Sequence, residues 1–219
     1  MAQRQDENES NKPRFVLMTP VVDDAERFAP ELAAACAAAD VAAVIVRLVP
    51  GSDAESLSRI SLLAPGVHKV GAALLLDNGV HLVDAANADG VHVAGSPAVG
   101  AARGLVKSDR MVGAGNLPSR HDSMTAGESG ADYVLFGEPG ENGTRPTIDS
   151  LAERLAWWSK LFVVPCVAYA AHIDEIAPFI RSGADFIALG DEVIWNASAG
   201  AAAAIAAAAV RLEAAEPVE

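Results

Sequence analysis

Polar side chains with binding chemistry directly follow short apolar runs in this sequence. Arg47 follows the run VAAVIV, Asp77 follows LLL, and Asn116 follows MVGAG. An Arg guanidinium binds phosphate or carboxylate through its planar fork, whereas carboxylate oxygens are ligands for a hard cation such as Mg²⁺. Asp77 is therefore predicted to bind a ligand or a metal ion, and Arg47 and Asn116 are predicted to belong to the same site.

For two further polar residues, a purely structural role is an alternative to ligand binding. Asn78 precedes a helical pattern, so its side-chain oxygen fits the N-cap of a helix as well as it fits a ligand. His92 lies in the run GVHV between two valines. It is predicted to point towards the interior or the rim of the fold, either as a ligand residue or as a hydrogen-bonded core histidine.

The longest connection between apolar runs is 138–147, with the sequence EPGENGTRPT. Loops of this length in a compact domain often bind ligands or close over a site. Thr144 and Arg145 are its candidate phosphate-binding residues, because Arg145 supplies a cation next to a hydroxyl group. The alternative is a solvated surface loop.

Backbone groups near the end of the chain form another candidate site. Barrels of alternating strands and helices commonly hold phosphate on backbone N–H groups near their last two strands. The corresponding segments are 170–172 (Ala170, Ala171 and a histidine) and 189–191. Gly190 permits close approach of the backbone, although Asp191 would repel a phosphate.

A recurrent Ala-Asp dipeptide indicates which elements position these residues. In each case a helical pattern ends at the dipeptide and an apolar run begins, which suits a strand of a parallel sheet that is buried on both faces. The dipeptides recur at about twice the length of one strand–helix unit. They are Ala39-Asp40, Ala88-Asp89, Ala131-Asp132 and Ala184-Asp185.

The strands between these marked ones follow from the remaining apolar runs. The pattern predicts further strands over 15–19, 70–76, 111–115 and 162–168, and helices over 24–39, 53–63, 79–86, 96–104, 119–127, 148–159, 173–181 and 198–213. Eight strands that alternate with eight helices predict an α/β fold, a single all-parallel (β/α)₈ TIM barrel. An open, doubly wound sheet is the alternative.

The barrel domain is predicted over 13–213, between disordered tails at 1–12 and 214–219. The net charge of −13 argues against a nucleic-acid surface, which needs clustered cations. The Ala-rich tract 197–210 is shorter than the ~20 residues that span a bilayer. Cys36 and Cys166 lie in apolar surroundings, as buried reduced thiols do. A cytoplasmic protein without membrane contact is expected, and a homo-oligomer is left open.

Four stretches together resemble the thiamine-phosphate synthase family and its TenI relatives. The resemblance extends from about the second strand to the eighth. The run ADGVHV at 88–93 is similar to the family's ADGVHLGQ, and GADYVLFG at 130–137 to its GADYIGFGP. In the same way, VPCVA at 164–168 is similar to IPVVAIGG, and GADFIAL at 183–189 to GADGVAVVS.

This resemblance implies a reaction and its ligands. The family joins a pyrimidine diphosphate to a thiazole phosphate and releases pyrophosphate, with Mg²⁺ shielding the leaving group. The resemblance implies that this chain binds a small phosphorylated heterocyclic ligand. It implies either Mg²⁺ as the cofactor or no cofactor. Asp77 and Asn78 would stand for the family's Asn-Asp metal pair in inverted order, and the second metal carboxylate falls near Pro97, which has no ligating side chain.

Other family motifs are also changed. Arg47 alone remains of the two cations in QLREK, and Asn116 stands in place of a Ser-Thr-His stretch. The Thr-x-Thr-Lys phosphate clamp keeps Thr144 and Arg145, and Ala170 and Ala171 replace the glycines of a GGI loop.

The sequence therefore predicts a synthase-like protein with impaired catalysis. A TenI-like, non-synthase protein that binds or regulates through such a ligand is the alternative. Arg47, Asp77, Asn116 and Arg145 are expected to converge on one pocket.

Overall fold

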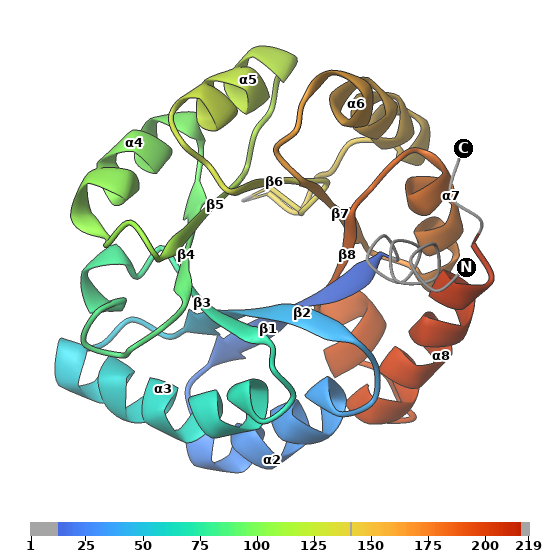
Figure 1. The fold of residues 1–219 in the computed structure, drawn as a ribbon. Coiled ribbons are helices and arrows are strands. Elements are labelled where there is room, and N and C mark those ends of the chain that lie inside the picture. Colours follow the sequence, from blue (N-terminus) through green and yellow to red (C-terminus); the bar gives the residue numbers. More distant parts are fainter. Residues whose placement is uncertain (1–12, 141, 216–219) are drawn as a thin grey trace, which may run out of the picture.

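Strands and helices alternate through residues 13–140 and 142–215, which the computed structural model describes (Figure 1). Each strand pairs in parallel with the next one along the chain, and β1 pairs with β8 to close the ring. The eight strands are β1 (Arg14–Val22), β2 (Val41–Leu48), β3 (Ala73–Asp77), β4 (Gly90–Ala94), β5 (Met111–Gly115), β6 (Tyr133–Phe136), β7 (Cys166–Ala170) and β8 (Phe186–Leu189). The predicted TIM barrel is confirmed, and the open sheet is excluded.

The helices surround the ring of strands (Figure 1). They are α2 (Ala25–Cys36), α3 (Asp53–His68), α4 (Ser96–Leu105), α5 (Arg120–Glu128), α6 (Ile148–Leu161), α7 (Ile176–Arg181) and α8 (Ala201–Glu213). Short helical turns complete the order: the 3₁₀ turns η1 (Val80–Leu82) and η2 (Ile173–Glu175), and the π turn η3 (Asp191–Trp195).

Alternate residues of the strands belong to two separate apolar clusters. One cluster includes Ile45, Leu135 and Val167 and fills the interior of the barrel. The other joins the outer faces of the strands to the helices, and it includes Leu32 of α2 and Trp158 of α6. Burial on both faces explains why the strands are continuous apolar runs rather than alternating ones.

The recurrent Asp residues lie at the N-terminal ends of the even-numbered strands, as predicted. Three of their carboxylates accept a hydrogen bond from the backbone of the preceding odd-numbered strand. Asp89 accepts from Leu74 N (2.7 Å), Asp132 from Val112 N (2.7 Å) and Asp185 from Cys166 N (2.8 Å). The fourth, Asp40, accepts from the side chain of Arg14 (2.8 Å). The repeat therefore joins neighbouring strands at the end of the barrel opposite to their C-terminal ends.

Several predicted boundaries were wrong. The strand predicted over 70–76 begins at Ala73, because the chain turns at Gly71, whose φ is +76°. The helix predicted over 79–86 is only η1, and the chain continues through turns from there to β4. The strand predicted over 162–168 begins after Pro165, which has no N–H to donate to a ladder.

Helix lengths also differ from the prediction. α3 continues beyond residue 63 to His68 and includes Pro65, although proline usually ends a helix. The helix predicted over 173–181 is divided into η2 and α7. The predicted tail 1–12 and residues 216–219 lie outside the described residues. Within the described ranges, none of the helices combines the length and the apolar character that crossing a membrane requires.

Candidate active site

A cavity of about 480 Å³ opens at the C-terminal ends of the strands. This is the end at which (β/α)₈ barrels carry their active sites. Residues from all eight strands or the loops after them converge there. The lining residues are Met18, Arg47, Asp77, Asn78, His92, Ala94, Gly115, Asn116, Glu138, Pro139, Gly140, Tyr169, Asp191 and Glu192. We call this the mouth cavity.

The mouth cavity brings together Arg47, Asp77 and Asn116, as predicted from the sequence, but not Arg145. Asp77 is the last residue of β3, and Arg47 lies near the end of β2. Asn116 directly follows β5 and has a φ of +49°, a backbone conformation that Asn adopts more readily than most residues. A local backbone requirement therefore accounts for Asn at position 116 as well as a ligand does.

Carboxylates outnumber cations in the mouth cavity. Asp77, Glu138, Asp191 and Glu192 line it, and among the described lining residues Arg47 is the one permanent cation. Arg47 donates to Asp191 Oδ2 (3.0 Å) and to the carbonyl of Thr19, so part of its charge is already neutralised. This arrangement is poorly suited to a ligand that carries several negative charges.

Asn78 connects the ends of two strands instead of capping a helix. Its Nδ2 donates to Asp77 Oδ1 (3.1 Å), and its Oδ1 accepts from Ala94 N (3.3 Å). The residue before η1 is Gly79, which makes no side-chain cap. The capping alternative is therefore wrong. Burial raises the pKa of Asp77, and the nearby charge of Arg47 partly offsets that rise.

His92 is buried and points into the barrel, where its Nδ1 pairs with the hydroxyl of Tyr133 (2.8 Å). Burial lowers the pKa of His92 to about 4, so the imidazole is neutral near pH 7. Its other ring nitrogen lies beside Gly115, where an added Cβ would collide with it and with Glu138 Oε1. The glycine thus makes room for His92 and Glu138 to approach each other.

Glu138 is a site residue that the sequence analysis did not single out. Its Oε1 accepts a hydrogen bond from the backbone N–H of Asn116. Burial raises the pKa of Glu138 to about 7, although this hydrogen bond lowers it. A carboxyl group with such a pKa can take up or release a proton near neutral pH. Its position two residues after the end of β6, at the end of the barrel that carries active sites, was the available signal.

Arg145 and Thr144 do not line the mouth cavity. Arg145 donates to the carbonyls of Gly137 (3.0 Å) and Tyr169 (2.8 Å), and it pairs with the carboxylate of Glu175 (2.8 Å). Thr144 hydrogen-bonds to Asn142 in its own loop. Both residues hold the connection between β6 and α6 in place.

The backbone positions predicted to hold phosphate are also occupied by the chain itself. Ala170 and Ala171 are buried, and Ala171 N donates to Glu175 Oε2 (3.0 Å). Gly190 packs against Tyr169, whose ring a Cβ at this position would meet. The hydroxyl of Tyr169 in turn donates to Glu192 (2.5 Å). The absence of a side chain at Gly190 therefore accommodates Tyr169.

The side chains do not form a ready-made metal centre. Among the residues that the structure describes, no three His, Cys, Asp or Glu side chains come together as a metal site. Mg²⁺ can use one or two protein carboxylates when a ligand supplies further oxygens. Asp77 alone thus does not hold a resident Mg²⁺ in the absence of a ligand, and a ligand would have to supply the further oxygens.

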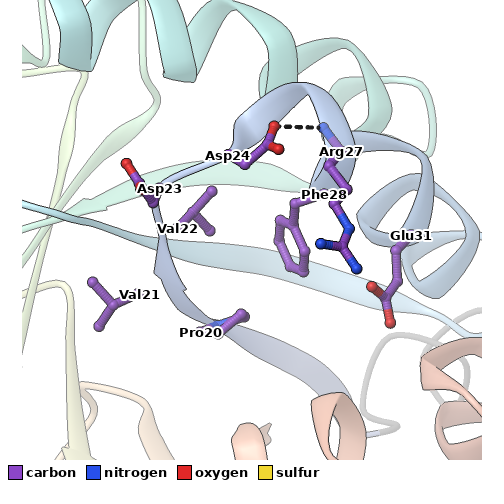
Figure 2. Close-up of a pocket in the computed structure, with 8 residues that line it drawn as sticks. All are labelled: Pro20, Val21, Val22, Asp23, Asp24, Arg27, Phe28 and Glu31. Carbon is purple, nitrogen blue, oxygen red and sulfur yellow. Dashed lines mark hydrogen bonds between the residues drawn. The ribbon is translucent and has the colours of Figure 1, made fainter.

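A second cavity, of about 300 Å³, lies between the end of β1 and α2 (Figure 2). Figure 2 shows Phe28 facing Pro20 and Val22, with charged side chains around the opening. One of these, Asp24, accepts from Arg27 N (3.0 Å) and so caps α2. Asp24 thus serves the helix terminus, whereas residues from all eight strands converge at the mouth cavity, which is the better candidate.

Comparison with known proteins agrees with this fold and identifies a family. The family described as thiamine monophosphate synthase matches residues 15–193. Thiamine-phosphate synthase of Rhodospirillum centenum is 42% identical over 88% of this chain and 94% of its own length. That of Hyphomonas neptunium is 32% identical over 88% of this chain and 90% of its own. A solved thiamine phosphate pyrophosphorylase from Pyrococcus furiosus has the same fold, with a TM-score of 0.77, 19% identity, and coverage of 95% of this chain and 99% of that chain.

Proposed function

Because this chain belongs to the thiamine monophosphate synthase family, we propose that its mouth cavity binds a small phosphorylated heterocycle of the pyrimidine or thiazole type. We further propose that it joins two such ligands, with release of pyrophosphate, far more slowly than an authentic synthase. Family membership supports the class of ligand, and the charges of the cavity support the impaired reaction.

The observation that carries this proposal is the balance of charges in the mouth cavity. A departing pyrophosphate develops negative charge that must be neutralised in the transition state. Arg47 is paired with Asp191, and Arg145 is paired with Glu175 outside the cavity. Losing one well-placed electrostatic donor typically costs ~10²–10³ in rate, and more than one is engaged elsewhere here.

Mg²⁺ would supply part of the missing positive charge if the ligand brought its own oxygens. Asp77 would then be the protein's carboxylate for it, by resemblance to the family. The remaining residues act through binding and proton transfer. Arg47 and the amide of Asn116 are suited to hold a single phosphate, and Glu138 can exchange a proton with a ligand near neutral pH.

The test is an assay of pyrophosphate release from the two family substrates in the presence of Mg²⁺, at equal concentrations of this protein and an authentic synthase. The expected turnover is at least about 10²-fold slower, as the loss of one electrostatic donor predicts. Turnover within tenfold of the authentic enzyme would contradict the proposed impairment.

The second candidate is a fully active synthase, which the names of the similar curated proteins favour. Rapid turnover would support it. A TenI-like protein that binds or regulates without synthesis remains the alternative if binding of a family substrate is measurable and turnover is absent. The cytoplasmic location and a homo-oligomeric state remain predictions, which cell fractionation and light scattering test.

A further inference from the structure

An ion pair lies outside the mouth cavity, at the ends of β6 and β7. Arg145 Nη1 contacts both carboxylate oxygens of Glu175, at 2.8 and 2.9 Å. The Glu175 side chain is 4% exposed and that of Arg145 is 18% exposed, so water screens the pair little. The carboxylate also accepts from Ala171 N at 3.0 Å.

These contacts form the shell of an anion site. A guanidinium and a backbone N–H converge on one buried, negatively charged group, as they do around bound phosphate or carboxylate. Arg145 is held in place by its bonds to the carbonyls of Gly137 and Tyr169, independently of Glu175. The donors are thus positioned by β6, β7 and the loop between them, whereas the acceptor comes from η2.

We infer that Arg145 and the Ala171 N–H form an anion site that the chain's own Glu175 carboxylate fills. Glu175 thereby determines specificity, because it excludes the phosphate of a ligand from the ends of β6 and β7. Tyr169, whose carbonyl binds Arg145, lines the mouth cavity, so the filled site adjoins the place where a ligand binds. The ligand's phosphate is left to Arg47 and Asn116.

This inference rests on the proposed function only in taking the mouth cavity as the ligand site. Its consequence for the stability of the protein without a family ligand does not depend on that function. Removing one partner of a buried ion pair leaves an uncompensated charge, which is strongly destabilising. An anion from solution that enters the vacated place should therefore bind and restore stability.

The experiment measures binding of inorganic phosphate to the full chain and to Glu175→Ala, by calorimetry and by thermal unfolding at constant ionic strength with chloride as the reference. Phosphate is expected to bind Glu175→Ala at least about tenfold more tightly than the unaltered chain, with a saturable rise in Tm. The double variant Glu175→Ala/Arg145→Ala should lose this gain.

Asp132→Ala is the matched control. Asp132 also accepts from an Arg, Arg103, and from a backbone N–H, but it lies at the opposite end of the barrel and is half-exposed. If Glu175→Ala does not fold in buffer alone, phosphate should specifically increase its yield on refolding, because the anion then takes the place of the missing carboxylate. Equal phosphate binding by the unaltered chain, Asp132→Ala and the Glu175 variants would overturn the inference, whatever the synthase assay shows.

Discussion

Near neutral pH the Glu138 carboxyl is only partly ionised in the folded protein. Its pKa is raised to about 7 from 4.5, so folding disfavours its charged form. Between about pH 4.5 and 7 the folded state binds more protons at this group than the unfolded state does. The contribution of Glu138 to stability therefore falls as the pH rises through this window, and it remains unfavourable above pH 7.

Glu138→Gln should consequently raise the free energy of unfolding at pH 8 by about 1–3 kcal/mol, since one pKa unit is worth about 1.36 kcal/mol. The gain should disappear below about pH 4.5, where Glu138 is protonated in both states. Urea unfolding at both pH values measures it. The exposed Glu153, substituted in the same way, is the control, with an expected change within about 0.5 kcal/mol. A variant that is less stable at pH 8 would contradict this account.

Gly113 in β5 is another residue whose identity is set by a neighbour. A Cβ at this position would overlap the ring of Tyr133, which holds His92. Gly113→Ala should therefore destabilise the protein by about 1–3 kcal/mol through overpacking. Gly100→Ala is the control, because a Cβ there meets nothing within 4 Å and Ala favours the helix α4 by about 0.5–1 kcal/mol. Thermal unfolding of both variants should show shifts of opposite sign.

The sequence predicted site residues where a polar side chain directly follows an apolar run. Arg47, Asp77 and Asn116 reached the mouth cavity for this reason, because the ends of parallel strands meet at one face. Arg145 did not, since it lies well inside a loop whose path the sequence does not determine. Its partner, Glu175, is distant in sequence and was not predictable from local pattern.

At the scale of the elements, the recurrent Asp residues differ in what they bind, and this difference can be measured. Asp185 accepts from the backbone of Cys166, so Asp185→Ala should leave an unpaired N–H and cost about 1–3 kcal/mol. Asp40 pairs only with the half-exposed side chain of Arg14, so Asp40→Ala should cost about 0–1 kcal/mol. Urea unfolding of the two variants compares them, and equal losses would show that the backbone contact contributes little.

The existence and order of the strands were predictable because each is an apolar run with a turn residue before it. Their N-terminal boundaries were less so where glycine or proline interrupts the run, as Gly71 and Pro165 do before β3 and β7. Helix lengths were the other source of error. Only the turn η1 forms where the alternating pattern predicted a helix over 79–86, and the helix predicted over 173–181 is divided into η2 and α7.

At the scale of the whole molecule, the net charge of −13 acts on stability through self-repulsion. Raising NaCl from about 0.01 to 0.15 M shortens the Debye length from about 30 to 8 Å and should raise the Tm at pH 8 by about 2–4 °C, equivalent to about 1 kcal/mol. At pH 5, close to the pI of about 4.7, the same change should have little effect. A fall in Tm with salt at pH 8 would mean that surface ion pairs outweigh the repulsion.

Trp195 gives the molecule an optical reporter of its own site. Its indole Nε1 donates to the carbonyl of Met18 (2.6 Å), and Met18 lines the mouth cavity. Indole emission responds to the polarity and hydrogen bonding of its surroundings, so a ligand that displaces the end of β1 changes the emission of Trp195. With Trp157 and Trp158 of α6 replaced by Phe, that signal is read without a label, and candidate ligands can be titrated by fluorescence before any reaction is known.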